Sequence, residues 1–408
     1  MATLHTPPAP ASDELPEAPF VLAPVRKRLA LAVGGGSLLA LLLLGGMALA
    51  MNRLAWVHTE PLGNPVYGIN YDCNQAEYLL LEDPKLGPAG YVSDDRPGRA
   101  EWCAANFAQV LEATGAKHVR LSVVWRDVEP SEGVYDFRVI DALLTTAEAH
   151  NVQVLLTVGM RAQRHPEFYI PNWALADVHM PEGAVVSDDP LLRERALTMV
   201  QAAMQHLSGS QVVEAWGAEN EPYVPSKRAD WWRLGRDYVQ QVAGIIRESD
   251  PQGRPVVVNQ AQQGLFDTYP AERKAILQDA DVLGISFYPF RDYPVFGIDF
   301  TVAIPELGWI HPNYAAHRKQ ADAAGKQYWI TELQGEPWAQ VDPRLITPQH
   351  PSPNLSPSDL ANVIQYGRRT GAQRMYLWGA EWWLYEQQFF GDSRWLEAAR
   401  PWLTESAP

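Results

Sequence analysis

Residues 212–222 read VVEAWGAENEP, a mostly apolar run that ends in two glutamates, an asparagine and a proline. The apolar part predicts a buried strand ending near Ala218. Charged side chains are rarely buried unless they are paired. Glu219 and Glu221 therefore belong either on a surface loop or at the mouth of a site where carboxylates do acid–base work.

The same kind of apolar run recurs along the chain and alternates with amphipathic stretches. Strands that alternate with helices imply a parallel sheet with right-handed crossovers, and eight such units imply an α/β (β/α)₈ TIM barrel. In this fold the C-terminal ends of the strands carry the active site, and residues 218–222 lie at such an end. The expected strands are residues 66–71, 118–125, 152–158, 212–218, 255–259, 281–288, 327–331 and 374–378, and the expected helices are residues 99–114, 139–150, 191–207, 231–247, 314–324 and 359–370.

Composition limits the classes of function. The chain has 408 residues, of which 47% are hydrophobic, so a large core can form. A net charge of −15 argues against a nucleic-acid partner, because phosphate binding needs a basic surface. The histidine and cysteine spacings predict no metal site, and no glycine-rich phosphate loop follows a strand. No cofactor is implied, and the sequence does not indicate an oligomeric state.

The N-terminus predicts a membrane anchor. Residues 1–28 form a Pro/Ala-rich tail that is expected to be disordered in the cytoplasm and that ends in the basic cluster 26–28. The uncharged run 29–51 exceeds the roughly 20 apolar residues that span a bilayer. Because the basic cluster precedes it, we expect a single-pass signal anchor, a linker at 52–65 and an extracytoplasmic barrel over 66–408.

Two features of this exported arrangement stay open. Ala48-Leu49-Ala50 also fits a signal-peptidase site, so the alternative is secretion after cleavage of the apolar segment. Cys73 and Cys103 both fall on the exported side, where disulfides persist. They are either bridged near the top of the barrel or two unpaired buried thiols.

A second carboxylate stands at another expected strand end. Residues 327–332 read QYWITE, five strand-like residues followed by Glu332. Glu221 and Glu332 end the fourth and seventh expected strands, so both should face the same barrel mouth. Retaining glycoside hydrolysis needs such a pair: one carboxylic acid protonates the leaving oxygen, while a carboxylate about 5–5.5 Å away attacks the anomeric carbon.

Over about residues 66–383 the chain resembles the clan A retaining glycoside hydrolases, which are cellulase-like, family-five-like TIM barrels. Asn220-Glu221-Pro222 matches their Asn-Glu-Pro motif. The resemblance implies that Glu221 is the acid/base, that Asn220 holds the sugar 2-hydroxyl group and that Glu332 is the nucleophile. Glu219, which should point to the opposite face of the strand, is then structural.

Three more residues take roles from the same resemblance. The segment RLSVVWRDVEPSEGVYDF, residues 120–137, is similar to the second-strand signature, which implies that Arg120 lies near Glu332 and keeps it ionised. Tyr288, in ISFYPF, resembles the tyrosine that hydrogen-bonds the nucleophile. Trp378 resembles the aromatic platform beneath the reacting sugar. For each of these, ordinary packing at the barrel interior or rim is the alternative.

The chain also departs from that pattern. Many members of the family carry a histidine after strand three or four, and His165 is the one candidate for it in this chain. Glu336, in the segment TELQGEPW, is a second departure. It is either a second acid of the site, which binds a basic or hydroxyl-rich substrate, or a solvated loop residue. We expect a retaining hydrolase of an extracellular poly- or oligosaccharide; the alternative is a non-catalytic carbohydrate-binding barrel at the cell surface. Eight aromatic residues are available at the rim for sugar stacking: Tyr169, Trp173, Tyr223, Trp231, Trp309, Trp338, Trp382 and Trp383. Of these, we expect Trp338 to bind the substrate.

Overall fold

The computed structural model describes most of the chain from residue 64 onward, together with one segment near the N-terminus. The described residues are 37–47, 64–81, 98–164, 167–226, 229–261, 269–295, 298–303, 314–337, 342–352 and 354–404. The backbone alone is described at 291–295 and 298–303. His165, Trp309 and Trp338, three residues named from the sequence, lie outside these ranges.

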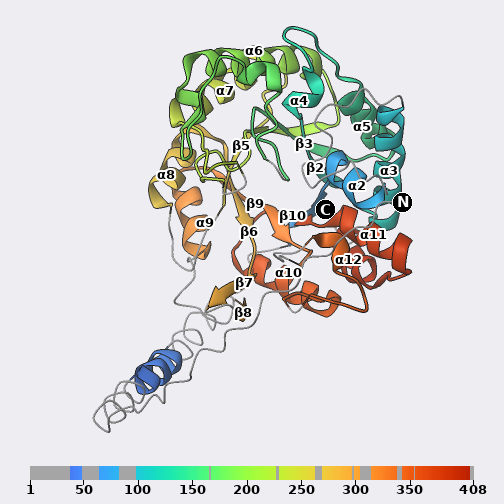
Figure 1. Ribbon diagram of the computed structural model, residues 1–408, viewed down its shortest axis with the longest axis vertical. Helices are drawn as coiled ribbons and strands as arrows, with labels where there is room; N and C mark the ends of the chain where they lie inside the picture. Colours follow the sequence, from blue (N-terminus) through green and yellow to red (C-terminus); the bar gives the residue numbers. More distant parts are fainter. Residues whose placement is uncertain are drawn as a thin grey trace, which may run out of the picture.

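Eight parallel strands close into a barrel, in the order β1-β10-β9-β6-β5-β4-β3-β2 (Figure 1). The ring closes because β1 pairs with both β10 and β2. The predicted (β/α)₈ fold is therefore confirmed, and each predicted strand overlaps an observed one. The barrel strands are β1 (Val66–Asn70), β2 (His118–Ser122), β3 (Gln153–Val158), β4 (Val213–Ala218), β5 (Val256–Ala261), β6 (Val282–Phe287), β9 (Gln327–Gln334) and β10 (Arg374–Trp378).

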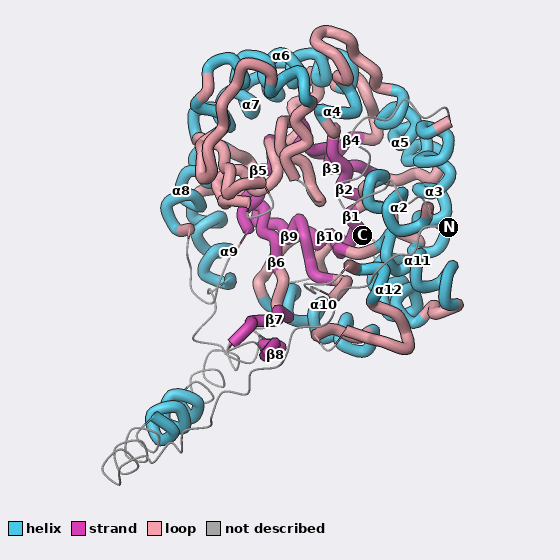
Figure 2. The backbone as a smooth tube through the Cα atoms, in the orientation of Figure 1, coloured by secondary structure: helices cyan, strands magenta, loops and turns pink. Residues whose placement is uncertain are grey.

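Helices surround the strands (Figure 2). Local signals place several of their ends: the helix that follows β3 begins at Pro190, and the side chain of Asp189 accepts a hydrogen bond from the amide of Leu192 as an N-cap. The described helices of the barrel unit are α2 (Cys73–Leu80), α3 (Arg99–Thr114), α4 (Trp125–Val128), α5 (Arg138–Ala149), α6 (Pro190–Leu207), α7 (Arg236–Ser249), α8 (Pro270–Asp279), α9 (Tyr314–Ala323), α10 (Leu360–Arg369), α11 (Ala380–Phe390) and α12 (Arg394–Thr404), with short 3₁₀ turns at Asn172–Leu175, Val186–Asp188, Pro343–Leu345 and Pro357–Asp359.

The structure corrects several predicted boundaries. β2 ends at Ser122 because Trp125 already begins α4, and α7 begins at Arg236 and not near 231. Helices α2, α4, α8, α11 and α12 and the antiparallel pair β7 (Phe290–Val295) and β8 (Ile298–Ala303) were not predicted. The β7–β8 pair forms its own sheet, outside the closed barrel (Figures 1 and 2).

Large and small residues alternate between neighbouring strands inside the barrel. Tyr376 on β10 lies in register with Gly68 on β1, and Trp329 on β9 lies in register with Gly284 on β6. A Cβ at Gly68 would stand 2.8 Å from the Tyr376 ring and 2.5 Å from the carbonyl oxygen of His118. The glycine is therefore needed for the aromatic ring to fill the interior layer.

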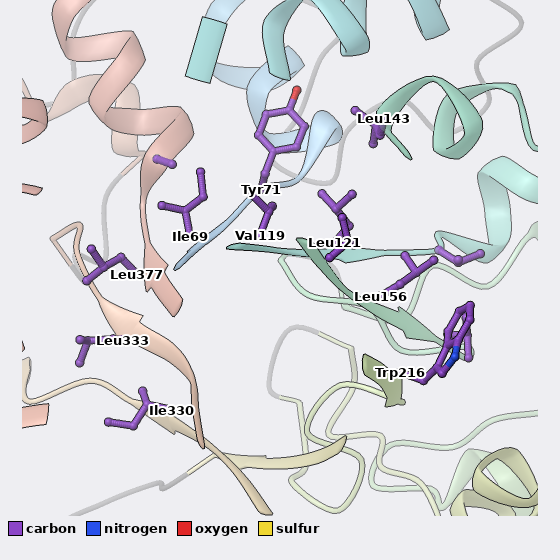
Figure 3. Close-up of a cluster of buried hydrophobic side chains, with 14 of the residues drawn as sticks. Ile69, Tyr71, Val119, Leu121, Leu143, Leu156, Trp216, Ile330, Leu333 and Leu377 are labelled. Atoms are coloured by element: carbon purple, nitrogen blue, oxygen red, sulfur yellow. The ribbon is translucent and has the colours of Figure 1, made fainter. Parts of the chain in front are cut away.

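The main hydrophobic core lies between the outer face of the barrel and the helices. Figure 3 shows strand residues of this layer, with Ile69, Leu121, Leu156 and Ile330 among those labelled. All four side chains are buried, and they alternate along their strands with residues that face the barrel interior. This packing fixes the strand ends that carry polar residues at the barrel mouth.

A disulfide joins Cys73, at the start of α2, to Cys103 in α3. The sequence left this pair open between a disulfide and two thiols, and the structure has the disulfide. It ties the segment after β1 to the first long helix of the barrel.

We expect loss of this bridge to destabilise the fold. The two cysteines are 30 residues apart in sequence, so replacing both by alanine releases loop entropy in the unfolded chain and should lower the free energy of unfolding by about 3–4 kcal/mol. Urea unfolding of wild type and of the Cys73→Ala/Cys103→Ala variant measures this, with reductant-treated wild type as the control. An unchanged midpoint in both samples would contradict it.

The predicted anchor is described only in part. Residues 37–47 form a helix, drawn in blue in Figure 1 apart from the barrel, whose leucines and methionine expose between 45% and 66% of their surface. Among the described helices, none has both the length and the apolar character needed to cross a membrane. The remaining residues of the predicted span 29–51 lie outside the described ranges.

Candidate active site

The chain after β4 turns sharply. Glu219 and Glu221 both have positive φ, 66° and 44°, which glutamate rarely adopts. Such backbone costs on the order of 1–3 kcal/mol per residue and persists where surrounding contacts enforce it, most often at functional sites. Here the amide of Glu219 donates to the carbonyl of Val158 and the amide of Asn220 donates to the carbonyl of Arg161, which holds the turn against the end of β3.

Glu219 is a structural residue of this turn. It is buried, and its carboxylate accepts hydrogen bonds from the amides of Met160 and Arg161, at 3.0 and 2.8 Å, and from the hydroxyl of Tyr238 at 2.8 Å. A Cβ at Gly159 would stand 2.1 Å from this carboxyl group, so residue 159 must be glycine for Glu219 to fit. Glu219 thereby positions the loop after β3. It lies in the turn after β4 and not within the strand, where strand alternation was expected to orient it.

Glu332 lies within β9, which continues to Gln334 instead of ending at Thr331. The pairing of β6 with β9 shifts register here: Ile285 pairs with Ile330, but the next residue, Ser286, pairs with Glu332. A β-bulge of this kind inserts one residue and re-aims a side chain, and bulges are common beside active sites. The bulge is the local reason that a strand residue can present its carboxylate at the mouth.

Two side chains hold the carboxylate of Glu332. Arg120 donates to Oε1 at 2.8 Å, and the hydroxyl of Tyr288 donates to Oε2 at 2.9 Å. Arg120 is 1% exposed, so this ion pair is shielded from solvent. The positive charge and the hydrogen bond stabilise the negative charge on Glu332. The structure thus brings together three residues that were singled out from the sequence.

Arg120 also connects Glu332 to the end of β4. Its other terminal nitrogen donates to Oδ1 of Asn220 at 2.6 Å, and the same oxygen accepts a hydrogen bond from Nδ2 of Asn259 at 3.0 Å. Asn259 in turn accepts the amide hydrogen of Glu221 on its Oδ1 at 2.9 Å. This network fixes the backbone of Asn220 and Glu221 relative to Glu332.

The surroundings of Glu221 shift the pKa of its carboxyl group. Its side chain is 12% exposed. Burial raises the pKa of Glu221 to about 8, the negative charge of Glu332 adds to this rise, and Arg161 opposes it. Glu221 is therefore mostly protonated at neutral pH, beside a carboxylate that is held in an ion pair.

Arg161 contacts Glu221, and this contact was not predicted from the sequence. One terminal nitrogen of Arg161 donates to the carbonyls of Glu221 and Val224, and the other is paired with Glu167 and lies 3.9 Å from Oε2 of Glu221. Arg161 is 1% exposed. It anchors the turn while placing a positive charge near the carboxyl group of Glu221.

Trp378 lies at the end of β10 but is not an open platform on both faces. The guanidinium of Arg164 covers one face of its ring at 4.0 Å, and its indole N–H donates to Oε1 of Glu336 at 2.9 Å. Tyr288 meets it edge-on, with ring centroids 6.3 Å apart. Trp378 is only 6% exposed, so a sugar could stack on it only by reaching the face opposite Arg164.

Several aromatic residues expected at the rim are elsewhere. Trp382 and Trp383 are buried in α11, and Trp383 donates its indole N–H to the carbonyl of Gly335. Tyr169 and Tyr223 are also buried, and Trp173 is partly buried against the core. Among the described residues of that list, Trp231 alone is exposed, at 41%. The expectation of a broad aromatic rim was wrong for these buried residues; Trp382 and Trp383 belong to the stretch Ala380–Glu386 of α11, which is buried throughout.

Asn70 and Asn259 are two further polar residues of the site that sequence reasoning missed. Asn70 ends β1, accepts from Arg120 at 3.3 Å and donates to the carbonyl of Thr331 at 3.0 Å. Asn259 interrupts the apolar run of β5. An asparagine within an apolar barrel strand could have indicated a site residue, because its buried side-chain amide needs hydrogen-bond partners.

Residues 100–240 match the glycosyl hydrolase family 42 model, described as beta-galactosidase. This match covers β2 to β4 and therefore includes Arg120 and Glu221. No curated protein matches the chain.

Solved structures match over most of the barrel at low identity. The beta-galactosidase from the psychrophilic Marinomonas ef1 is 15% identical, with 76% of this chain and 53% of that chain covered and a TM-score of 0.50. GH5_18 from Streptomyces cattleya, in complex with GlcNAc, is 13% identical, with 85% and 82% covered and a TM-score of 0.52. The beta-galactosidase from the Antarctic haloarchaeon Halorubrum lacusprofundi is 14% identical, with 84% and 58% covered and a TM-score of 0.51.

The chain thus spans about half the length of the Marinomonas protein, at 53%. At these identities the structural likeness shows the barrel fold. The family match, over residues 100–240, is to a family of glycoside hydrolases. The narrower family-five-like resemblance is not confirmed.

Proposed function

We propose that this protein is a retaining glycoside hydrolase that cleaves O-glycosidic bonds of an extracytoplasmic poly- or oligosaccharide by double displacement. The observation that carries the proposal is the pairing of two unlike carboxyl groups. Glu221 has a pKa raised to about 8, whereas Glu332 is held by Arg120 and Tyr288. A carboxyl group with a raised pKa beside one that is held by an arginine and a tyrosine suits an acid and a nucleophile.

The first step forms the glycosyl-enzyme. Glu332 attacks the anomeric carbon while Glu221 gives its proton to the departing glycosidic oxygen, so the C–O bond to the leaving group breaks as the bond to Glu332 forms. Asn220, whose Oδ1 already accepts from Arg120 and Asn259, keeps its amide nitrogen for the sugar 2-hydroxyl group.

The second step releases the sugar. Once Glu332 is esterified its negative charge is gone, so the pKa of Glu221 falls and Glu221 can remove a proton from water. Water then attacks the anomeric carbon, the ester bond breaks and Glu332 is restored. Two inversions give net retention of configuration.

The proposal is tested by substrate screening. Because the matched family is described as beta-galactosidase, 4-nitrophenyl β-galactoside is the first probe, followed by the β-glucoside, β-mannoside and β-xyloside and a panel of polysaccharides. We expect turnover of at least one probe, with NMR showing the β anomer as the first product. Saturable binding without turnover of any probe would instead favour a carbohydrate-binding barrel.

The pH dependence follows from the protonation of Glu221. Because its pKa is raised to about 8 and the protonated form is the acid, kcat/KM should fall as pH rises through about 8. The fall should be absent with a dinitrophenyl glycoside, whose leaving group needs no proton. Initial rates between about pH 5 and pH 10 measure both profiles. An alkaline limb that is identical for the two leaving groups would contradict the assignment of this limb to Glu221.

We also propose that residues 29–51 hold the protein in a membrane, with the barrel outside the cytoplasm. The exposed leucines of helix 37–47 support this, because an apolar surface of this kind is unfavourable in water. The Cys73–Cys103 disulfide supports export, since disulfides persist in oxidising compartments.

This location predicts that the full chain, expressed in a bacterial host, stays in the pellet after carbonate extraction. A Leu42→Arg/Leu43→Arg variant is the control and should appear in the soluble fraction, because each arginine costs about 2.5–3.5 kcal/mol in the middle of a spanning helix. A soluble wild-type product that begins near Met51 would show a cleaved signal instead.

A further inference from the structure

Glu336 is a partly buried acid that the proposed reaction does not use. It follows β9, and its side chain is 15% exposed. Its Oε1 accepts two hydrogen bonds, one from Arg164 at 2.6 Å and one from the indole N–H of Trp378 at 2.9 Å. Its Oε2 is buried and has no hydrogen-bond partner among the residues that the structure describes.

The surrounding backbone holds this acid close to Trp378. A Cβ at Gly379 would stand 2.8 Å from Cβ of Glu336, and one at Gly335 would stand 2.4 Å from the carbonyl oxygen of Trp378. Gly379 also has a φ of 117°, which side chains rarely adopt. The two glycines therefore let the chains after β9 and β10 approach each other, and Glu336 is fixed rather than solvated.

Trp378 links Glu336 to the catalytic pair. Its ring meets Tyr288 edge-on, and the hydroxyl of Tyr288 donates to Glu332. A sugar that presented its anomeric carbon to Glu332 and lay on the face of Trp378 opposite Arg164 would have ring hydroxyl groups near the edge of the indole. Glu336 occupies that edge, through the indole N–H.

We propose that Oε2 of Glu336 accepts a hydrogen bond from a ring hydroxyl group of the sugar bound at Glu332, and that Glu336 thereby selects a neutral sugar. This inference rests on the proposed function. A buried acceptor without a partner is costly, and a sugar hydroxyl group supplies the missing donor. The chemistry disfavours an acidic sugar, because Arg164 is already shared between the carboxylates of Glu336 and Glu381.

A substrate-deletion cycle tests this inference. The 4-nitrophenyl glycoside with the highest kcat/KM is compared with its monodeoxy analogues, each lacking one hydroxyl group other than that at C2, in wild type and in Glu336→Ala. In wild type one analogue should lose about 10–100-fold in kcat/KM, the range for a hydrogen bond to a charged group. In Glu336→Ala the parent glycoside should lose a similar factor, and that analogue should lose almost nothing further.

Glu381→Gln is the matched control, because Glu381 shares Arg164 through a 2.8 Å hydrogen bond. It should lower kcat/KM for the parent and its analogues by the same factor. If Glu336→Ala behaves in this way too, Glu336 only positions Arg164 and Trp378, and the inference is overturned. A wild-type protein that hydrolyses no glycoside overturns the proposed function, and this inference with it.

Discussion

Replacing Glu332 by alanine is expected to abolish hydrolysis of every glycoside, whatever its leaving group. Without the carboxylate no glycosyl-enzyme forms, and losses on the order of 10⁵–10⁶-fold in kcat are usual when a nucleophile is removed. Steady-state rates with a 4-nitrophenyl and a dinitrophenyl glycoside measure the effect.

Two controls separate this chemistry from misfolding. Glu332→Gln keeps an oxygen that can accept from Arg120 or Tyr288, so it should fold and be equally inactive. Azide should rescue Glu332→Ala by entering the space of the carboxylate, and its product should have inverted configuration. Rescue to a product of retained configuration would mean that the roles of Glu221 and Glu332 are reversed.

Replacing Glu221 by alanine is expected to affect substrates unequally. With a poor leaving group kcat/KM should fall about 10²–10⁴-fold, because general acid catalysis is lost. With a dinitrophenyl leaving group the first step should change little, and the glycosyl-enzyme should accumulate. Burst kinetics on both substrates measure the two steps separately.

Azide again provides the control. In Glu221→Ala it should attack the accumulated glycosyl-enzyme and give a glycosyl azide of retained configuration, because no base is needed to activate it. The alkaline limb near pH 8 should also disappear, since Glu221 causes it. A Glu221→Ala protein that is inactive on the dinitrophenyl substrate would contradict the assignment.

Much of the barrel could be predicted from sequence because its strands are buried on both faces. Such strands appear as short apolar runs, as at Gln153–Val158. The β7–β8 pair and the first helix after β1 could not be predicted in this way. Helix α2, CNQAEYLL, is short and mostly polar or small at its start, and the Cys73–Cys103 bridge and the Asp72 cap hold it in place.

Site residues that follow an apolar strand could be predicted from the sequence. Site residues that lie on loops could not. Glu221 and Glu332 both follow apolar runs, so their positions could be inferred. Arg161 and Arg164 lie in a loop with no periodic pattern, and Arg164 has a φ of 73°. Their contacts with Glu221 and Glu336 depend on the conformation of that loop, which the sequence does not encode as a pattern.

The same distinction applies to the bulge on β9. A bulge is a property of pairing between two strands, here Ile285–Ser286 against Ile330–Glu332, and neither strand shows it alone. The sequence placed Glu332 just after a strand, whereas the structure has it inside one. Its availability at the mouth results from this irregularity.

Mass-spectrometric location of a trapped glycosyl-enzyme tests the central proposal most directly. The most active glycoside is prepared as its 2-deoxy-2-fluoro derivative with a dinitrophenyl leaving group, which slows both steps but lets the first proceed. The wild-type protein is incubated with it, digested and sequenced by mass spectrometry. The proposal predicts one sugar, attached to Glu332. A sugar attached to Glu221 or Glu336, or steady hydrolysis with inverted configuration and no attached sugar, would contradict it.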